Sequence, residues 1–376
     1  MIAARSIWRR LDLFQAAAAA LLAVLGIMTI YSAGADSAKQ SLWIVLGAGA
    51  YVLAAAFDYR RLMPPAAALY GGMVLLLLAV HLVGRSALGA RRWLSVAGFP
   101  LEPSELSKLL LVVTLAAFLG RQPSLSWRRF AAVLALAAPP AALILTQPDL
   151  GTTIVFAAIL VGMLFLGGAR PAQLASIGLA AVVTVPVLPL VLHGYQRRRL
   201  EIFLNPSSDP LGAGYNLLQA RIAVGAGGFF GQGWLHGLQG QLGFVPERAT
   251  DFVFAIYAEQ FGLLGSLFLL AIFGTLLVRV LKAAAVAPDR FGELIAGGVF
   301  VMVFSQFVEN VGMNIGVLPI AGIPLPLISY GGSATITTLA ALGLVQSVVL
   351  RRRTVVHERH AIYPDGFDAA TVRLTG

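Results

Sequence analysis

Long uninterrupted runs of apolar residues recur along the whole chain, and they restrict its fold more than any other feature. A helix that crosses a bilayer needs about 20 apolar residues, and about ten such runs are present. Lipid offers no hydrogen-bonding partner to a peptide group, and no alternation typical of a β-barrel appears, so these runs are expected to be helices. The expected spans are residues 11–32, 40–57, 66–83, 105–120, 130–146, 152–168, 172–193, 252–280, 292–316 and 333–350.

The composition agrees with a membrane protein. Hydrophobic residues make up 58% of the chain and charged residues only 12%, whereas a soluble domain carries about 25% charged residues. We therefore predict an all-α, polytopic membrane protein with about ten transmembrane helices. The chain has no cysteine, which excludes disulfides, thiolate metal sites and Cys nucleophiles.

The placement of basic residues predicts the orientation. In a soluble protein, a net charge of +10 would suggest a nucleic-acid partner. Here most basic residues fall on the cytoplasmic side when the N-terminus is placed there, as the positive-inside rule requires, so no nucleic-acid partner is expected. We predict a single membrane domain over residues 1–350, a cytoplasmic tail over residues 351–376 and a large extracytoplasmic loop over residues 194–251.

That outer loop carries arginines that short outer loops usually avoid, and this leaves two interpretations open. They belong either to a solvated surface or to an anion-binding site outside the cytoplasm. The same loop contains a glycine-rich segment, residues 223–234, whose glycines allow a backbone to approach a ligand or another helix closely. It does not match a phosphate-binding loop. The arginines are Arg197, Arg198, Arg199, Arg221 and Arg248.

Asp251 stands directly before a long apolar run, at the expected mouth of a membrane helix. One interpretation is a helix cap, which stabilises a helix by about 1 kcal/mol. The other is a general base, because a carboxylate held ionised near arginine can accept a proton. The position of Asp251 alone does not separate these roles.

Three further polar clusters fall on the same outer side. Glu105 and Lys108 are three residues apart and can pair on one helix face, either as a structural ion pair or as part of a site. Ser104 is a candidate cap for that helix, and Asp149 for the helix of residues 152–168. The Pro- and Gly-rich segment of residues 310–334 is expected to line a cavity or to be buried in protein. Four unrelated caps need not share a side, so we expect these clusters to surround one cavity.

These segments together resemble the SEDS family of bacterial membrane glycosyltransferases, which includes RodA, FtsW and SpoVE. Each motif is short, but all occur in the family's order over about Leu11 to Arg352, and the string from Gly322 to Gly332 is most like RodA. The motifs are Gly89-Ala90…Arg92-Trp93, Pro103-Ser104-Glu105…Lys108, Gln147-Pro148-Asp149-Leu150-Gly151-Thr152, Gly225…Gly227-Gly228…Gly231…Gly233, Pro246-Glu247…Thr250-Asp251-Phe252 and Pro324-Leu325-Pro326…Ser329-Tyr330-Gly331-Gly332-Ser333.

The resemblance implies an inner-membrane enzyme that polymerises lipid II into glycan strands and releases undecaprenyl diphosphate, in cell elongation. It places the essential carboxylate at Asp251. It also implies a class B penicillin-binding protein as a partner, alongside lipid II, the undecaprenyl-linked glycan and membrane lipids. No tightly bound cofactor is expected, although a divalent cation (Mg or Mn) held by the diphosphate could share in stabilising it. The expected substrate- or diphosphate-binding residues are Arg92, Glu105, Lys108, Asp149, Gln219, Arg221, Arg248, Ser329 and Tyr330.

The sequence departs from the family pattern at a few positions, and other functions stay open. Glu102 stands where the family usually has Gln, Ala249 replaces a common His, and Ala220-Arg221 replaces a usual Ser after Gln219. The alternatives are a lipid II flippase, an FtsW-like division polymerase and a scaffold that activates its partner. A flippase needs access to both leaflets, whereas the polar clusters here gather on one side.

Overall fold

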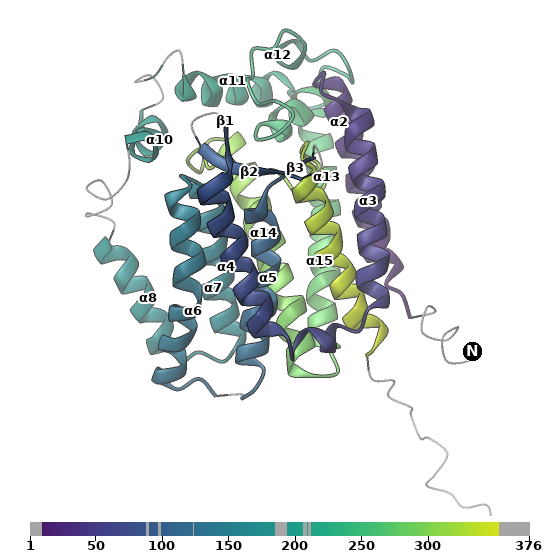
Figure 1. The fold of residues 1–376 in the computed structure, drawn as a ribbon. Helices are drawn as coiled ribbons and strands as arrows, with labels where there is room; N and C mark the ends of the chain where they lie inside the picture. The colour runs from purple at the N-terminus through teal and green to yellow at the C-terminus, as the bar shows by residue number, and fades with distance from the viewer. Residues whose placement is uncertain are drawn as a thin grey trace, which may run out of the picture.

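The computed structural model describes residues 10–87, 90–96, 99–122, 124–184, 194–205, 209 and 212–352. Within these ranges the chain is a helical bundle with a small sheet at one end (Figure 1). The helices are α2 (Leu13–Ser32), α3 (Ser37–Ala56), η1 (Tyr59–Leu62), α4 (Ala66–Val83), α5 (Pro103–Leu119), α6 (Trp127–Thr146), α7 (Leu150–Leu166), α8 (Pro171–Thr184), α10 (Gly194–Leu204), α11 (Ala213–Ala226), α12 (Leu238–Gln241), α13 (Val253–Ala285), α14 (Arg290–Asn314) and α15 (Gly332–Leu350).

The apolar runs of the sequence form helices wherever the structure describes them, which confirms the helical fold. Seven helices in the described ranges are long and apolar enough to cross a membrane, namely α2, α3, α4, α6, α13, α14 and α15. The helices α7 and α8 are apolar but shorter. The run predicted at 172–193 is described only to Thr184, because residues 185–193 lie outside the described ranges. The count of about ten spans therefore stays a prediction.

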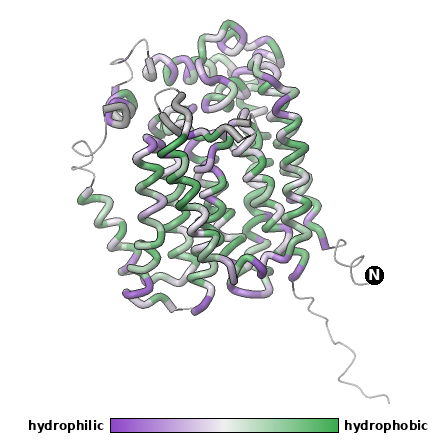
Figure 2. The backbone as a smooth tube through the Cα atoms, viewed as in Figure 1, coloured by the Kyte–Doolittle hydropathy of each residue, from purple (hydrophilic) through white to green (hydrophobic). Residues whose placement is uncertain are grey.

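The sides of the bundle expose hydrocarbon, as expected of a surface that faces lipid. Figure 2 shows hydrophobic residues along the helices and hydrophilic residues gathered toward the two ends. Large side chains such as Leu53 on α3 and Phe165 on α7 are more than half exposed. The helices α5 and α15 lie inside the bundle instead, and most residues of each are buried. Both are packed by protein on all sides, so they can carry polar groups that lipid would not tolerate.

A three-stranded antiparallel sheet, which the sequence did not predict, lies between α4 and α5. Its strands β1 (Arg85–Ala87), β2 (Ala90–Val96) and β3 (Phe99–Leu101) are arranged in the order β1-β2-β3. The sheet lies at the end of the bundle opposite to the start of α2 and the end of α15 (Figure 1). The helices α11 and α12 of the predicted outer loop lie across the same end. The sheet and the helices α11 and α12 thus cover the end of the bundle at which the polar clusters of the sequence lie.

The glycine-rich segment packs against a break in α13. Gly262 has a φ of 65°, which interrupts the helix. The main-chain amides of Leu263 and Leu264 donate to the carbonyls of Gly228 (2.9 Å) and Phe229 (3.2 Å). A Cβ on Gly231 would overlap the main chain at Gln260. The glycines thus allow this segment to approach another helix closely, which was one of the two expected roles. The carbonyls of the segment also accept hydrogen bonds from amides that the break leaves without a helical partner.

A Gly231→Ala substitution is expected to destabilise the protein by more than about 2 kcal/mol, because a left-handed φ and a steric overlap both oppose the methyl group. Gly231 has a φ of 85°, and its Cβ position overlaps the main chain of Gln260, which cannot rotate away as a side chain could. Thermal unfolding of the purified protein in detergent measures the effect. Gly178→Ala on α8 is the control, since no atom lies within 4 Å of its Cβ position. Equal melting temperatures for the two variants would contradict this account.

Candidate active site

A cavity of about 700 Å³ opens at the sheet end of the bundle. Its walls come from segments far apart in the sequence: α3, the sheet, the starts of α5 and α7, α11, the chain before α13 and the chain before α15. Residues from each of the four polar clusters line this one cavity, as expected. The polar side chains on its surface are Arg92, Glu102, Glu105, Thr152, Asn216, Glu247, Thr250, Asp251, Tyr330 and Ser333.

Asp251 lies on the wall of this cavity, and its main chain is held from two directions. Asn310 and Asn314 of α14 both donate from Nδ2 to its carbonyl oxygen, at 2.9 and 3.0 Å. The Ser329 hydroxyl donates to the carbonyl of Thr250 at 2.6 Å. The capping position of α13 is occupied by Phe252 and not by Asp251. Of the two interpretations of Asp251, the helix cap is therefore not supported, since Phe252 separates Asp251 from the first helical residue, Val253.

Glu105 and Lys108 form the predicted ion pair inside the bundle. Lys108 Nζ lies 2.7 Å from Glu105 Oε1, and both side chains are almost fully buried. Glu105 reaches the cavity surface, whereas Lys108 lies behind it. The predicted cap by Ser104 is wrong. The capping residue of α5 is Glu102, and the Ser104 hydroxyl is buried without a hydrogen bond to any described residue.

Arg92 joins the cavity to the start of α7. Its Nη1 lies 3.7 Å from Asp149 Oδ1, and its Nη2 donates to the carbonyl of Pro148 at 2.6 Å. Asp149 is the capping residue of α7, as predicted, and accepts from the Thr152 amide at 3.1 Å. Asp149 is buried, so its charge is balanced by Arg92 and by the N-terminal end of the helix. Arg92 is the only one of the expected diphosphate ligands that brings a cation to the wall of this cavity.

Comparisons with known proteins identify the family of this chain. A family model described as a cell cycle protein and named for FtsW, RodA and SpoVE matches residues 11–354. The chain belongs to the FtsW/RodA/SpoVE family. A relative from Escherichia coli, the peptidoglycan glycosyltransferase MrdB, is 44% identical over 76% of this chain and 78% of its own. The peptidoglycan glycosyltransferase RodA of Treponema pallidum is 32% identical over 88% of this chain and 95% of its own.

Two solved structures share the family's fold with this chain. A chain from a peptidoglycan synthase complex, described for its coordination of polymerization and crosslinking, superposes with a TM-score of 0.80 at 34% identity, over 90% of this chain and 97% of its own. RodA from Thermus thermophilus gives a TM-score of 0.70 at 31% identity, over 92% of this chain and 98% of its own. With these relatives and its apolar helices, the chain is an integral membrane protein.

Several residues that the family resemblance suggested lie away from the cavity wall. The side chain of Arg221 donates from Nη2 to the carbonyl of Gly316 (2.8 Å), and that of Arg248 donates from Nε to the carbonyl of Ala33 (2.6 Å). Ser329 supports the chain at Thr250, and Gln219 lies on α11. In this family member the two arginines thus fasten the outer loop to the bundle. Their role as diphosphate ligands stays a prediction.

Trp43 and Asn216 line the cavity, although no pattern in the sequence indicated either of them. Trp43 on α3 packs against Tyr330, with ring centroids 5.0 Å apart and the ring planes tilted by 56°, and both residues line the cavity. Aromatic faces pack well against the apolar face of a sugar ring. Asn216 comes from α11 of the outer loop. A lone Trp in a membrane helix and a lone Asn in a loop carry no pattern, so only tertiary structure reveals them.

Glu102 is a titratable group on the cavity wall at a position where the family usually has Gln. Its amide donates to the Ser333 hydroxyl at 2.9 Å, which fixes it beside the start of α15. Burial raises the pKa of Glu102 to about 8, and the charges of Glu105 and Asp149 add to the effect, while Arg92 and Lys108 oppose it. The Glu102 carboxyl is therefore mostly neutral at pH 7.

A second buried acid, Glu309 on α14, was also missed from the sequence. It lies within electrostatic range of Lys108 and Asp149, and neither of its carboxylate oxygens has a hydrogen-bond partner among the described residues. Around Asp149, the four carboxyl groups of Glu102, Glu105, Asp149 and Glu309 thus interact with only two cations among the described residues, Arg92 and Lys108. No three His, Asp or Glu side chains of the described ranges gather as a metal site. A divalent cation in this cavity would depend on ligands from the substrate, and its involvement stays a prediction.

Proposed function

We propose that this chain is a RodA-type peptidoglycan glycosyltransferase, acting in cell elongation, which polymerises lipid II at the cavity that contains Asp251. The single observation that carries the proposal is the position of Asp251: a carboxylate on the wall of a 700 Å³ cavity, on main chain held by Asn310, Asn314 and Ser329. Family relatives named as peptidoglycan glycosyltransferases support the reaction class.

In the proposed mechanism Asp251 accepts a proton from the 4-hydroxyl of the acceptor sugar. The oxygen of that hydroxyl forms a bond to C1 of the donor sugar while the bond from C1 to the diphosphate breaks. A sugar hydroxyl is a weak nucleophile, and a positioned base typically accelerates such a step by about 10²–10⁴-fold. The electron pair of the broken bond leaves with undecaprenyl diphosphate, which is already anionic and needs no proton to depart.

Arg92 is the residue best placed to stabilise the leaving diphosphate. It lies on the cavity wall, its guanidinium is oriented by Asp149 and the Pro148 carbonyl, and it retains N–H groups for a ligand. Glu105 on the cavity wall and Lys108 behind it form a buried ion pair that holds this part of the wall rigid. Trp43 and Tyr330 offer aromatic surface for a sugar ring.

The orientation and partner belong to the same proposal. We place the protein in the bacterial inner membrane with both chain ends in the cytoplasm and the cavity outside, where undecaprenyl-linked glycan is assembled. We assign a class B penicillin-binding protein as its partner, because one solved relative belongs to a complex described for polymerization and crosslinking. The donor is lipid II.

The decisive experiment uses purified protein and fluorescent lipid II in detergent, where no compartment exists. Glycan strands resolved on a gel are the expected product. If the protein only moves lipid II between leaflets of liposomes and makes no polymer in detergent, the glycosyltransferase proposal is wrong and a flippase is the better account.

Glu102 predicts a pH dependence of this reaction. Below its pKa of about 8 the carboxyl is neutral, and above it the group adds a negative charge to a wall that must accept an anionic diphosphate. Polymerisation by the wild type is therefore expected to fall as pH rises through 8. The Glu102→Gln variant is expected to lack that fall. Superimposable pH–rate profiles of the two proteins between pH 6 and about 9 would contradict the assignment.

A further inference from the structure

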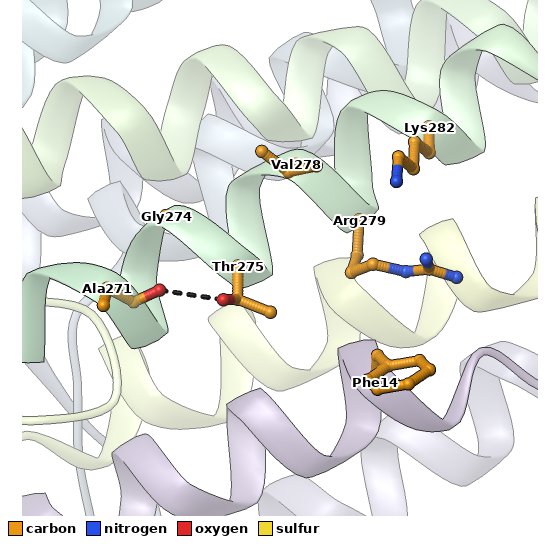
Figure 3. Close-up of a pocket in the computed structure, with 7 residues that line it drawn as sticks. All are labelled: Phe14, Ala271, Gly274, Thr275, Val278, Arg279 and Lys282. Carbon is orange, nitrogen blue, oxygen red and sulfur yellow. Dashed lines mark hydrogen bonds between the residues drawn. The ribbon is translucent and has the colours of Figure 1, made fainter. Parts of the chain in front are cut away.

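A second hollow lies at the opposite end of the bundle, on the outer surface between α2 and α13. It is an open groove of about 490 Å³, and Figure 3 shows Phe14 of α2 facing Arg279 of α13 across it. This end also holds the start of α2 and the end of α15, where Arg10 Nη1 donates to the carbonyl of Arg352. The groove shares no residue with the proposed active site.

The floor of the groove is hydrocarbon. Ala271, Thr275 and Val278 follow one another at spacings of three and four residues and so form a stripe on one face of α13. The Thr275 hydroxyl donates to the carbonyl of Ala271 at 2.8 Å, which leaves its methyl group available to the groove. Gly274 keeps the groove open, because no atom lies within 4 Å of its Cβ position. The aromatic ring of Phe14, which is 68% exposed, closes the other side.

The groove matches one leaflet in length. From Ala271 to Lys282 the helix rises by about 16 Å, at 1.5 Å per residue. Half of a bilayer's hydrocarbon core is about 15 Å. One acyl chain laid along the stripe therefore reaches from the interface to the middle of the membrane.

The mouth of the groove carries positive charge. The Arg279 guanidinium pairs with Asp12 (Nη2 to Oδ2, 2.6 Å) and lies 5.4 Å from the centroid of the Phe14 ring, so its position is fixed. Lys282 lies one turn further along α13, exposed, and pairs with no carboxylate among the described residues. The two positive charges of Arg279 and Lys282 exceed the one negative charge of Asp12 by one. This excess matches the single negative charge of a phosphodiester.

We propose that this groove is a binding site for an anionic glycerophospholipid, with one acyl chain along Ala271, Gly274 and Val278 and the phosphate at Lys282 and Arg279. The general attraction of basic residues to an anionic leaflet does not require a groove or a fixed guanidinium. A partner's transmembrane helix would fill the apolar floor but would bring no phosphate to Lys282. The proposal rests on the groove alone and is independent of the reaction at the other end.

The headgroup contact is tested by titrating the full-length protein in detergent with phosphatidylglycerol or phosphatidylcholine and counting bound lipids by native mass spectrometry. The wild type is expected to retain phosphatidylglycerol in preference. Lys282→Gln is expected to weaken that binding about fivefold, the effect of one cation near a headgroup. Arg61→Gln is the matched control, because Arg61 is an exposed cation on η1, which packs on α14 and α15 rather than at the groove.

The acyl contact is tested with Gly274→Leu, which adds a side chain to the groove at a position where the Cβ has no atom within 4 Å. It is expected to reduce phosphatidylglycerol binding at least as much as Lys282→Gln does. Gly72→Leu on α4 is the control, since it also adds a side chain into open space on an exposed face. The proposal is overturned if Lys282→Gln and Arg61→Gln lower binding equally, if Gly274→Leu has no effect, or if the wild type shows no preference for phosphatidylglycerol.

Discussion

The Asp251→Asn variant is expected to fold as the wild type does and to polymerise lipid II at least about 100-fold more slowly, the lower end of what a general base contributes. Asparagine has almost the same shape as aspartate but does not accept the proton of a sugar hydroxyl. The contacts that hold this segment involve the carbonyl oxygen of Asp251, which the substitution leaves in place. The measurement is the initial rate of strand formation from fluorescent lipid II in detergent.

A matched control separates loss of the base from loss of charge. Glu247 lies on the wall of the same cavity, and the proposed mechanism gives it no proton to accept. Glu247→Gln is therefore expected to retain most of the wild-type rate. Melting temperatures of both variants should equal that of the wild type. Wild-type turnover by Asp251→Asn would refute the base, and equal losses in both variants would point to the net charge of the cavity instead.

Breaking the buried pair of Glu105 and Lys108 is the second change with a large expected effect. Lys108→Met leaves Glu105 as an uncompensated charge inside the bundle and also removes a cation that interacts with Glu102 and Glu309. Removing one partner of a buried ion pair typically costs about 3–5 kcal/mol. We expect a melting temperature well below that of the wild type and little polymerisation. Glu105→Gln is expected to lower activity as well, because it releases Lys108 from its position behind the cavity.

The double variant Glu105→Gln/Lys108→Met distinguishes a structural pair from a functional one. With both charges removed, stability is expected to return most of the way, since no unpaired charge remains. The proposal predicts that polymerisation stays low in this stable protein, because Glu105 is part of the cavity wall. A double variant with restored stability and wild-type kinetics would make the pair purely structural.

The sequence predicted the helices well because their cause is local. Each apolar run carries its own information: a peptide chain in lipid must satisfy its own hydrogen bonds, and a helix does so within one segment. The small sheet was not predicted because its three strands depend on pairing with one another. The break at Gly262 was also invisible in the sequence, since it is stabilised by hydrogen bonds that the amides of Leu263 and Leu264 donate to the carbonyls of residues 228 and 229. Such pairings cannot be seen in either segment alone.

The same division holds for the site. Motif spacing was sufficient to pair Glu105 with Lys108 and to make Asp149 a cap, because both contacts lie within one helical turn. It was also sufficient to place Arg92, Asp251 and Tyr330 on one side of the membrane. Tertiary structure decided what that side contains. It brought Trp43 and Asn216 to the cavity.

The tertiary structure also separated residues that the sequence had grouped together. Arg221 and Arg248 lie in the same outer loop as Asn216, yet their side chains donate to main-chain carbonyls outside the cavity wall. Asp251, for which the sequence left a helix cap and a general base open, lies on the cavity surface, one residue before the capping residue Phe252. Apolar runs and motif order thus specified a membrane-embedded helical bundle and placed the family motifs together at one of its ends. Which of those groups share a cavity depends on packing between segments hundreds of residues apart, and only the folded chain decides it.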